Sequence, residues 1–400
     1  MRHNFILAGM NSTENIQTST RWTNDVLIGL FMLLLWLPML DTFFHLDWAP
    51  VPTENRSLAV FPKNPIGWRG LQPYVAGLEV YFNDHFGCRK CLLEWHNKLR
   101  WALFKDQSTR NVLVGKDGWL FYTQHQMIDH YTGLLQFTPD QLHDWQVLLE
   151  KRRDWLAKRG IAYLFVVTPD KQTIYPEYLP DWLVKSKVRP QTKLDQFVAY
   201  MHEHSSVPIL DQREVVLEAK SIYPTFFKTD VHWNPFAGFV AYQELMQTLA
   251  KQRPGLDKPL PLTSFTITNR VMPELVTGGD LARILGLKMT ESNCYILELV
   301  PNSGLPNYTS QIAPAERPRE PRYTDNPQAK GRMIVFQDSF GMGWFQFLGY
   351  HFNKVIYLWQ YDLNPAFIEQ NTPDIVVSEM NERFFNIEDP KKMMAKEALE

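Results

Sequence analysis

Short apolar runs with the length of buried β-strands recur from residue 162 onward, and segments with helical spacing separate them. The runs are Ala162–Val167, Val207–Leu210, Arg332–Phe336, Lys354–Trp359 and Asp374–Val377. Continuous apolar strands that alternate with helices are typical of a parallel sheet covered on both faces. The sequence therefore predicts an α/β fold with a parallel sheet flanked by helices. Ligands bind such sheets beyond the carboxyl ends of the strands.

One serine lies where a strand is predicted to turn into a helix. Ser339 follows the run Arg332–Phe336 and precedes a predicted helix, Trp344–Phe352. A serine at such a turn is exposed above the sheet and meets free backbone N–H groups that can stabilise an oxyanion. The alternative is that Asp338 and Ser339 only cap the following helix.

A second segment, Thr229–Pro235, contains an acid and an imidazole two residues apart. In an extended segment Asp230 and His232 face the same side, so the carboxylate can accept the Nδ1 proton and leave Nε2 as a base. The alternative is a solvated turn before a helix that begins at Asn234-Pro235. With Ser339, the segment supplies the nucleophile, base and orienting carboxylate that make a hydroxyl reactive.

The composition argues against other kinds of site. The chain has 41 basic and 43 acidic residues, whereas nucleic-acid-binding proteins usually carry a basic excess. Cys88 and Cys91 form a C-x-x-C without the further ligands of a zinc site, and a local disulfide is the alternative to two packed thiols. No histidine pair has metal-binding spacing and no glycine-rich phosphate loop is present, so we expect neither a metal nor a cofactor.

The apolar run Val26–Leu40 predicts a transmembrane signal anchor over residues 26–46. A full span needs about 20 residues, so a cleaved signal peptide and a buried soluble helix are alternatives. Arg2 and Arg21 precede the run, and the positive-inside rule then places residues 1–25 in the cytoplasm. We therefore expect a single-pass inner-membrane protein whose remaining chain lies in the periplasm.

The rest of the chain divides into two predicted regions. Residues 47–110 are expected to form a helical lead-in, and residues 111–400 the catalytic domain. The segment 301–331 is rich in proline, asparagine and charge, which predicts a long loop or insertion. A capping box at Thr138 and Gln141 predicts a helix that begins there.

Several short motifs, in this order along the chain, resemble the SGNH-hydrolase-like polysaccharide O-acetyltransferases, the AlgJ/AlgX group of alginate acetylation proteins. The most specific is Asp-x-His-Trp-Asn at Asp230–Asn234. The others are Glu54-Asn55-Arg56, Gly118-Trp119-Leu120-Phe121, Pro169-Asp170-Lys171, Tyr175-Pro176, Gly278-Gly279-Asp280-Leu281, Asp338-Ser339-Phe340 and Glu382-Arg383.

The resemblance implies a periplasmic SGNH-like α/β domain with Ser339 as nucleophile, His232 as base and Asp230 as the residue that orients it. It also implies acetyl transfer to hydroxyls of an exopolysaccharide such as alginate. The acetyl group would reach the periplasm through a separate multi-pass membrane O-acyltransferase, which is the expected partner. The sequence shows no obvious added carbohydrate-binding domain, and in this it resembles the AlgJ type more than the AlgX type.

One position departs from the family pattern, because Gln337 stands where a glycine usually precedes Asp-Ser. Gln337 favours one competing function, a catalytically weak scaffold that binds polysaccharide in a secretion complex. The other competing function is an acetylesterase, which would have the same triad and differ only in the acceptor. Arg383, Lys171 and Tyr175 are candidate substrate contacts. A structural salt bridge is the alternative for Arg383, and an ordinary loop is the alternative for the other two.

Overall fold

The computed structural model describes residues 11–44, 59–65, 67–89, 92, 95, 99, 111–300, 304–305, 307–313, 317 and 319–399. They belong to two compact units, residues 1–105 and residues 106–400. The first unit contains the helices α1 (Asn11–Phe44) and α2 (Leu71–His85) and the short 3-10 helix η1 (Trp68–Gly70).

Helix α1 covers most of the predicted anchor at residues 26–46. Among the described residues, however, no helix combines the length and the apolar character that crossing a membrane requires. The uninterrupted apolar run Val26–Leu40 is shorter than the roughly 20 residues of a full span, and Asp25 and Asp41 bound it. The structure therefore does not support the transmembrane anchor.

The C-x-x-C motif is only partly described. The Cys88 backbone N–H donates to Asp41 Oδ2 at 2.6 Å. Cys91 lies outside the described residues.

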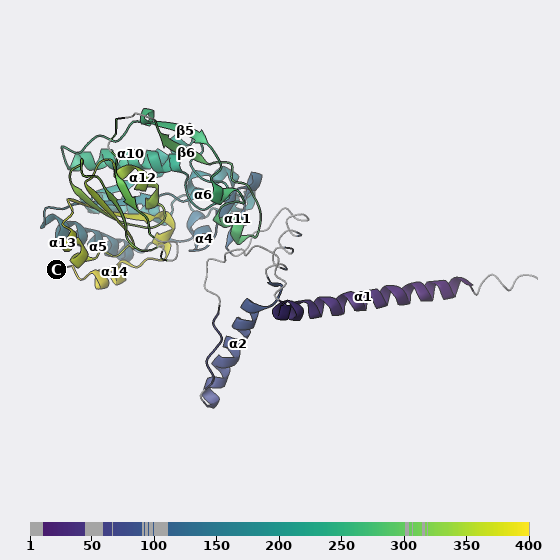
Figure 1. Ribbon diagram of the computed structural model, residues 1–400. Coiled ribbons are helices and arrows are strands. Elements are labelled where there is room, and N and C mark those ends of the chain that lie inside the picture. The colour runs from purple at the N-terminus through teal and green to yellow at the C-terminus, as the bar shows by residue number, and fades with distance from the viewer. Residues whose placement is uncertain are drawn as a thin grey trace, which may run out of the picture. The chain divides into compact units, whose positions relative to one another are not determined.

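The second unit is built on a seven-stranded sheet with the order β4-β3-β11-β9-β10-β8-β7 (Figure 1). The first five strands in this order are parallel, as predicted, and β8 and β7 are antiparallel. The strands are β3 (Ala162–Thr168), β4 (Ile209–Asp211), β7 (Thr309–Gln311), β8 (Arg322–Asp325), β9 (Arg332–Gln337), β10 (Lys354–Trp359) and β11 (Ile375–Asn381).

The predicted long loop at residues 301–331 contains the edge strand β7 and its neighbour β8. Residues of β8 pair with Lys354–Tyr357 of β10, so the sheet is mixed rather than wholly parallel. These two strands are largely polar, and β7 forms the edge of the sheet. Their sequence consequently carries no strand signal. The conformation of β8 depends on pairing with the buried strand β10, and that of β7 on pairing with β8.

Helices cover both faces of the sheet (Figure 1). Side chains of the central strands alternate between two cores. On β9, Met333 and Val335 belong to one core, and Ile334 and Phe336 to the other. The helices are α4 (Met127–Tyr131), α5 (Pro139–Ala157), α6 (Lys171–Ile174), α7 (Asp181–Lys185), α8 (Lys193–His204), α9 (Arg213–Ala219), α10 (Pro235–Gln252), α11 (Asp280–Ile284), α12 (Phe345–Leu348), α13 (Pro365–Asn371) and α14 (Pro390–Glu397).

Residues of α9, α10 and α12 belong to the core that contains Met333, and residues of α5, α8, α13 and α14 to the core that contains Ile334. Helix α5 begins with the predicted capping box, in which Thr138 and Gln141 bond reciprocally. Two antiparallel hairpins accompany the sheet. They are β1 (Val112–Val114) with β2 (Leu120–Tyr122), and β5 (Phe265–Asn269) with β6 (Tyr295–Leu299).

Candidate active site

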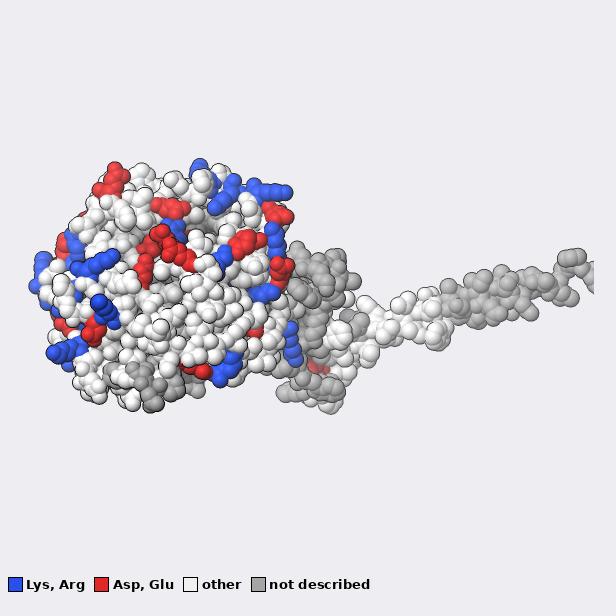
Figure 2. Space-filling view, turned by 90° about the horizontal axis from the view of Figure 1, so that it is seen from above, with Lys and Arg blue, Asp and Glu red and all other residues white. Residues whose placement is uncertain are grey.

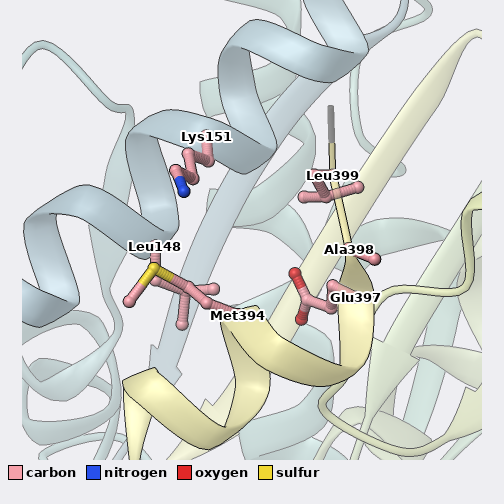
Figure 3. A pocket seen from close by; sticks show the side chains of 6 residues that line it. All are labelled: Leu148, Lys151, Met394, Glu397, Ala398 and Leu399. Carbon is pink, nitrogen blue, oxygen red and sulfur yellow. The ribbon is translucent and has the colours of Figure 1, made fainter.

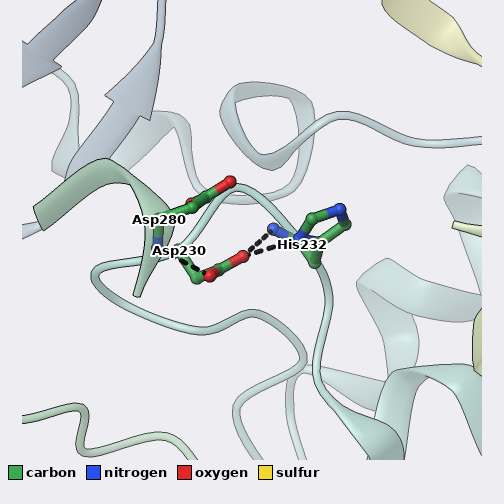
Figure 4. A group of neighbouring side chains, drawn as sticks. All are labelled: Asp230, His232 and Asp280. Carbon is green, nitrogen blue, oxygen red and sulfur yellow. Dashed lines mark hydrogen bonds and ion pairs between the residues drawn. The ribbon is translucent and has the colours of Figure 1, made fainter. Parts of the chain in front are cut away.

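The structure brings Ser339, His232 and Asp230 together. His232 Nε2 lies 2.8 Å from Ser339 Oγ, and His232 Nδ1 lies 2.7 Å from Asp230 Oδ1. Figure 4 shows the imidazole edge facing the Asp230 carboxylate. These distances are those of hydrogen bonds. The geometry therefore allows the imidazole to accept the hydroxyl proton while the carboxylate holds the opposite ring nitrogen.

Burial and charge pairing shift the pKa values of the acid and the imidazole. Burial would raise the pKa of Asp230, but the charge and hydrogen bond of His232 outweigh it and hold this pKa well below its ordinary value. Burial would lower the pKa of His232, but the Asp230 carboxylate raises it above 6.5. Each partner therefore favours the charged form of the other. A charged Asp230 stabilises the imidazolium that forms when His232 takes a proton.

The loop that carries the imidazole is fixed at both sides. A bridge joins Phe226 to Trp233, and the Asn234 backbone N–H donates to Thr225 O at 3.0 Å. Asn234 also caps α10, because its side chain accepts the Ala237 N–H. The predicted cap is thus present, and it leaves the side chain of His232 free to face Ser339.

Ser339 lies in the turn after β9, followed by the short 3-10 helix η6 (Gly341–Trp344). The predicted helix Trp344–Phe352 is only the four-residue α12. Neither Asp338 nor Ser339 caps η6.

Asp338 holds this turn through contacts with two neighbouring elements. Its Oδ2 accepts the Tyr361 hydroxyl at 2.6 Å and the Asn381 N–H at 2.9 Å, and its Oδ1 accepts the Phe340 N–H at 2.7 Å. The Asp338 N–H in turn donates to Glu379 Oε2 at 2.9 Å. Burial and the neighbouring Asp338 charge raise the pKa of Glu379 well above its usual range, which favours the neutral form of this carboxyl.

Gln337, which replaces the family's usual glycine, is buried beneath the turn. Its Nε2 lies 2.9 Å from Met342 Sδ, and a Cβ on Gly341 would lie 2.5 Å from its Oε1. The Gln337 side chain thus occupies the space that Gly341 leaves open. Gly343 likewise allows Trp233 to approach, because a Cβ there would lie 2.7 Å from Trp233 Nε1.

Arg383 is 6% exposed and ion-paired rather than located at a solvent-facing rim. Its Nη2 lies 2.6 Å from Asp170 Oδ1, and its Nε donates to Asn381 Oδ1 at 2.7 Å. The guanidinium also lies 5.3 Å from the ring centre of Phe340, the residue after Ser339. The salt bridge considered from the sequence is therefore present.

Lys171 is buried, and its ammonium donates to Leu120 O at 2.7 Å. Burial lowers its pKa to about 8. Tyr175 borders a pocket of about 380 Å³, and its ring stacks on Trp119 at 4.4 Å between centroids. We call this the Trp119 pocket. It is lined by Asp117, Trp119, Tyr175, Glu177, Tyr178, Lys220, Pro224, Lys228, Ser292 and Asn293.

Among the described residues, the ligand-type atoms of Asp230, His232 and Asp280 lie within 4.8 Å of one another. This cluster has the donor types of a metal site, but N–H groups already occupy both Asp230 oxygens. Oδ1 accepts the His232 N–H at 3.0 Å, and Oδ2 accepts the Asp280 N–H at 2.8 Å. The cluster fits an acid–imidazole pair with a second acid beside it (Figure 4). Asp280 was not among the site residues predicted from the sequence.

A further pocket of about 140 Å³ lies between α5 and α14 (Figure 3). Its lining residue Glu397 forms a buried ion pair with Arg152 and accepts the Leu363 N–H, so the charge there is structural. On the face drawn in Figure 2, basic and acidic residues are interspersed. This distribution matches the nearly neutral net charge and provides no basic surface for nucleic acid on that face.

The mostly parallel sheet with helices on both faces defines an α/β protein, and the serine–imidazole–carboxylate arrangement lies beyond the strand ends, where such sheets bind ligands. A family model described as "SGNH hydrolase-like domain, acetyltransferase AlgX" matches residues 112–328, which is more than half of the chain. The chain belongs to this family.

Curated relatives include two proteins named "Probable alginate O-acetylase AlgJ". The one from Pseudomonas syringae pv. tomato is 28% identical over 55% of this chain and 52% of its own length. The one from Pseudomonas putida is 28% identical over 54% of this chain and 52% of its own length. The chain thus spans about half the length of the curated relatives it matches. The solved structure of Bacillus cereus PatB1 shares the fold with a TM-score of 0.52 and 18% identity, covering 70% of this chain and 98% of PatB1.

Proposed function

We propose that this protein is an O-acetyltransferase that moves an acetyl group through Ser339 to hydroxyls of an exopolysaccharide of the alginate type. The observation that carries the proposal is the pair of contacts from His232 to Ser339 Oγ and to Asp230. Membership in the AlgX acetyltransferase family and the AlgJ relatives support the acetyl group and the polysaccharide acceptor.

The reaction takes two steps. Ser339 Oγ attacks the acetyl carbonyl carbon while His232 Nε2 takes its proton, and the donor's leaving group departs with that proton. A sugar hydroxyl then attacks the acetyl-serine ester and gives its proton to His232, which passes that proton to the departing Ser339 Oγ and so restores both residues. Within the described residues the Ser339 N–H has no hydrogen-bond partner, so it is the first candidate donor to the oxyanion.

The Trp119 pocket is the candidate site for the acceptor. Tyr178 and Trp119 provide aromatic surface, and Lys228, two residues before Asp230, provides an ammonium in the same lining. Aromatic surface combined with a few polar groups suits a sugar ring, and the lysine suits a uronate carboxylate. Tyr175 lines this pocket. Lys171 and Arg383 are buried and do not line it.

The test of transfer against simple hydrolysis uses the full chain with p-nitrophenyl acetate and alginate oligosaccharides. We expect mass spectrometry to find acetylated oligosaccharide, because the acceptor displaces water at the acetyl-serine. Acetate release without acetylated sugar would instead favour the esterase. Absence of any turnover above buffer would favour the polysaccharide-binding scaffold.

We also propose that the reaction takes place in the periplasm, with the acetyl group supplied by a multi-pass membrane O-acyltransferase. The support is the apolar run Val26–Leu40 after Arg2 and Arg21, which has the charge order of an export signal. Fractionation of cells that express the full chain is expected to place it outside the cytosolic fraction. Recovery in the cytosol would contradict export.

A further inference from the structure

The segment Gly278–Ala282 is hydrogen-bonded along its length to the loop that carries Asp230. The Asp280 N–H donates to Asp230 Oδ2 at 2.8 Å, and the Val231 N–H donates to Asp280 Oδ1 at 2.8 Å. We infer that Asp280 is a positioning residue that locks the Asp230 carboxylate toward His232 and places a second negative charge beside that imidazole. This inference rests on the proposed function of the same site.

Two further bonds extend the connection on either side of Asp280. The Gly279 N–H donates to Thr229 Oγ1 at 2.9 Å, and the Ala282 N–H donates to Thr229 O at 3.1 Å. Thr229 is itself fixed, because its hydroxyl and its backbone N–H donate to Glu291 Oε2 at 2.7 and 2.6 Å. Several hydrogen bonds therefore join the segment Gly278–Ala282 to the loop that carries Asp230. A shift of this segment would displace the loop.

The two glycines before Asp280 make this approach possible. A Cβ on Gly279 would lie 2.3 Å from Asp230 Cβ, a distance that no side chain tolerates. Gly278 has φ +105°, a conformation that side chains rarely adopt, and a Cβ there would lie 2.7 Å from Met289 O. The two glycines thus allow the backbone to lie against Asp230. The Asp280 that follows them accepts a hydrogen bond from Val231, the residue after Asp230.

The charge of Asp280 acts on the imidazole as well. Burial, together with the neighbouring Asp230, raises the pKa of Asp280 to about 6, so it is ionised above that pH. Its charge adds to that of Asp230 in raising the pKa of His232, whereas the Arg383 guanidinium opposes them.

The remaining titratable groups that interact with Asp280 are Lys171 and Tyr122. Lys171 lowers the pKa of Asp280 by its positive charge, and Asp280 contributes to the raised pKa of Tyr122. Neither group is bonded to Asp280 within the described residues, so the Asp280 carboxylate is the partner that can be altered without breaking another ion pair.

The experiment compares Asp280→Asn with Asp280→Ala in the full chain. The amide of Asp280→Asn can still accept the Val231 N–H but carries no charge, whereas Asp280→Ala loses both features. Glu274→Gln is the control, because Glu274 is an exposed acid shortly before this segment in the chain. His232 is titrated by NMR of labelled histidine, with its resonance identified from the signal missing in His232→Gln, and kcat/KM for p-nitrophenyl acetate is measured against pH.

We expect Asp280→Asn to move the His232 titration and the acid limb of kcat/KM to lower pH, because the imidazolium loses a stabilising charge. Asp280→Ala should in addition lower the plateau of kcat, up to about 100-fold, because misplacement of reacting groups by about 1 Å costs this much. Glu274→Gln should change neither quantity.

A His232 titration that is the same in Asp280→Asn and wild type would overturn the electrostatic part. An unchanged plateau in Asp280→Ala would overturn the positioning part. If Asp280→Ala fails to fold, the Asn variant still decides the electrostatic part. If the wild type has no serine-dependent turnover, the proposed function fails, and the NMR titration decides separately whether Asp280 acts on His232.

Discussion

Ser339→Ala should eliminate acetyl-ester turnover, with a loss of kcat on the order of 10⁶-fold, as is typical when a serine hydrolase loses its nucleophile. The physical reason is that Ser339 Oγ, 2.8 Å from His232 Nε2, is the hydroxyl that the imidazole can activate. The variant should keep its melting temperature, because the hydroxyl is half-buried and its described hydrogen bond is the one to His232.

The measurement pairs steady-state hydrolysis of p-nitrophenyl acetate with mass spectrometry of the acid-quenched protein. Wild type should show one added acetyl group on the peptide that contains Ser339, and the variant none. Ser310→Ala is the matched control, because Ser310 is an exposed serine on the edge strand β7. Retained turnover in Ser339→Ala would place the reaction at another residue and remove the acyl-enzyme mechanism.

The second large effect concerns the imidazole and its carboxylate. His232→Ala should abolish turnover as completely as Ser339→Ala, because residues that act as one unit are not additive. Asp230→Asn should lower kcat by about 10⁴-fold, since an amide no longer holds the required tautomer or stabilises the imidazolium. His202→Ala, an exposed histidine on α8, serves as the control and should leave turnover unchanged.

The pH dependence gives this prediction a direction. Asp230 raises the pKa of His232 above 6.5, and the base must be neutral, so wild-type kcat/KM should rise with pH through a value above 6.5. Any residual activity of Asp230→Asn should have its acid limb at lower pH, because the stabilising charge is gone. An acid limb that stays in place in Asp230→Asn would show that another group titrates.

The predictable parts of the fold are those in which local signals and burial agree. The five parallel strands were found from apolar runs, and α5 and α10 from their caps at Thr138 and Asn234. Strands β7 and β8 were expected to be loop, because β8 follows from pairing with β10, and β7 from pairing with β8, rather than from their own residues. The transmembrane anchor was expected from the apolar run Val26–Leu40, and among the described residues no helix is long and apolar enough to support it.

The candidate site divides in the same way. The sequence by itself determined which residue types are present and that Asp230 and His232 are neighbours, because a separation of two residues already brings their side chains to one side of an extended segment. Only the tertiary structure decided that His232 reaches Ser339, 107 residues away, and that Arg383 and Lys171 are buried partners of other groups. The tertiary structure also placed Asp280 beside Asp230. Contacts between such distant loops depend on how the sheet and its connections pack.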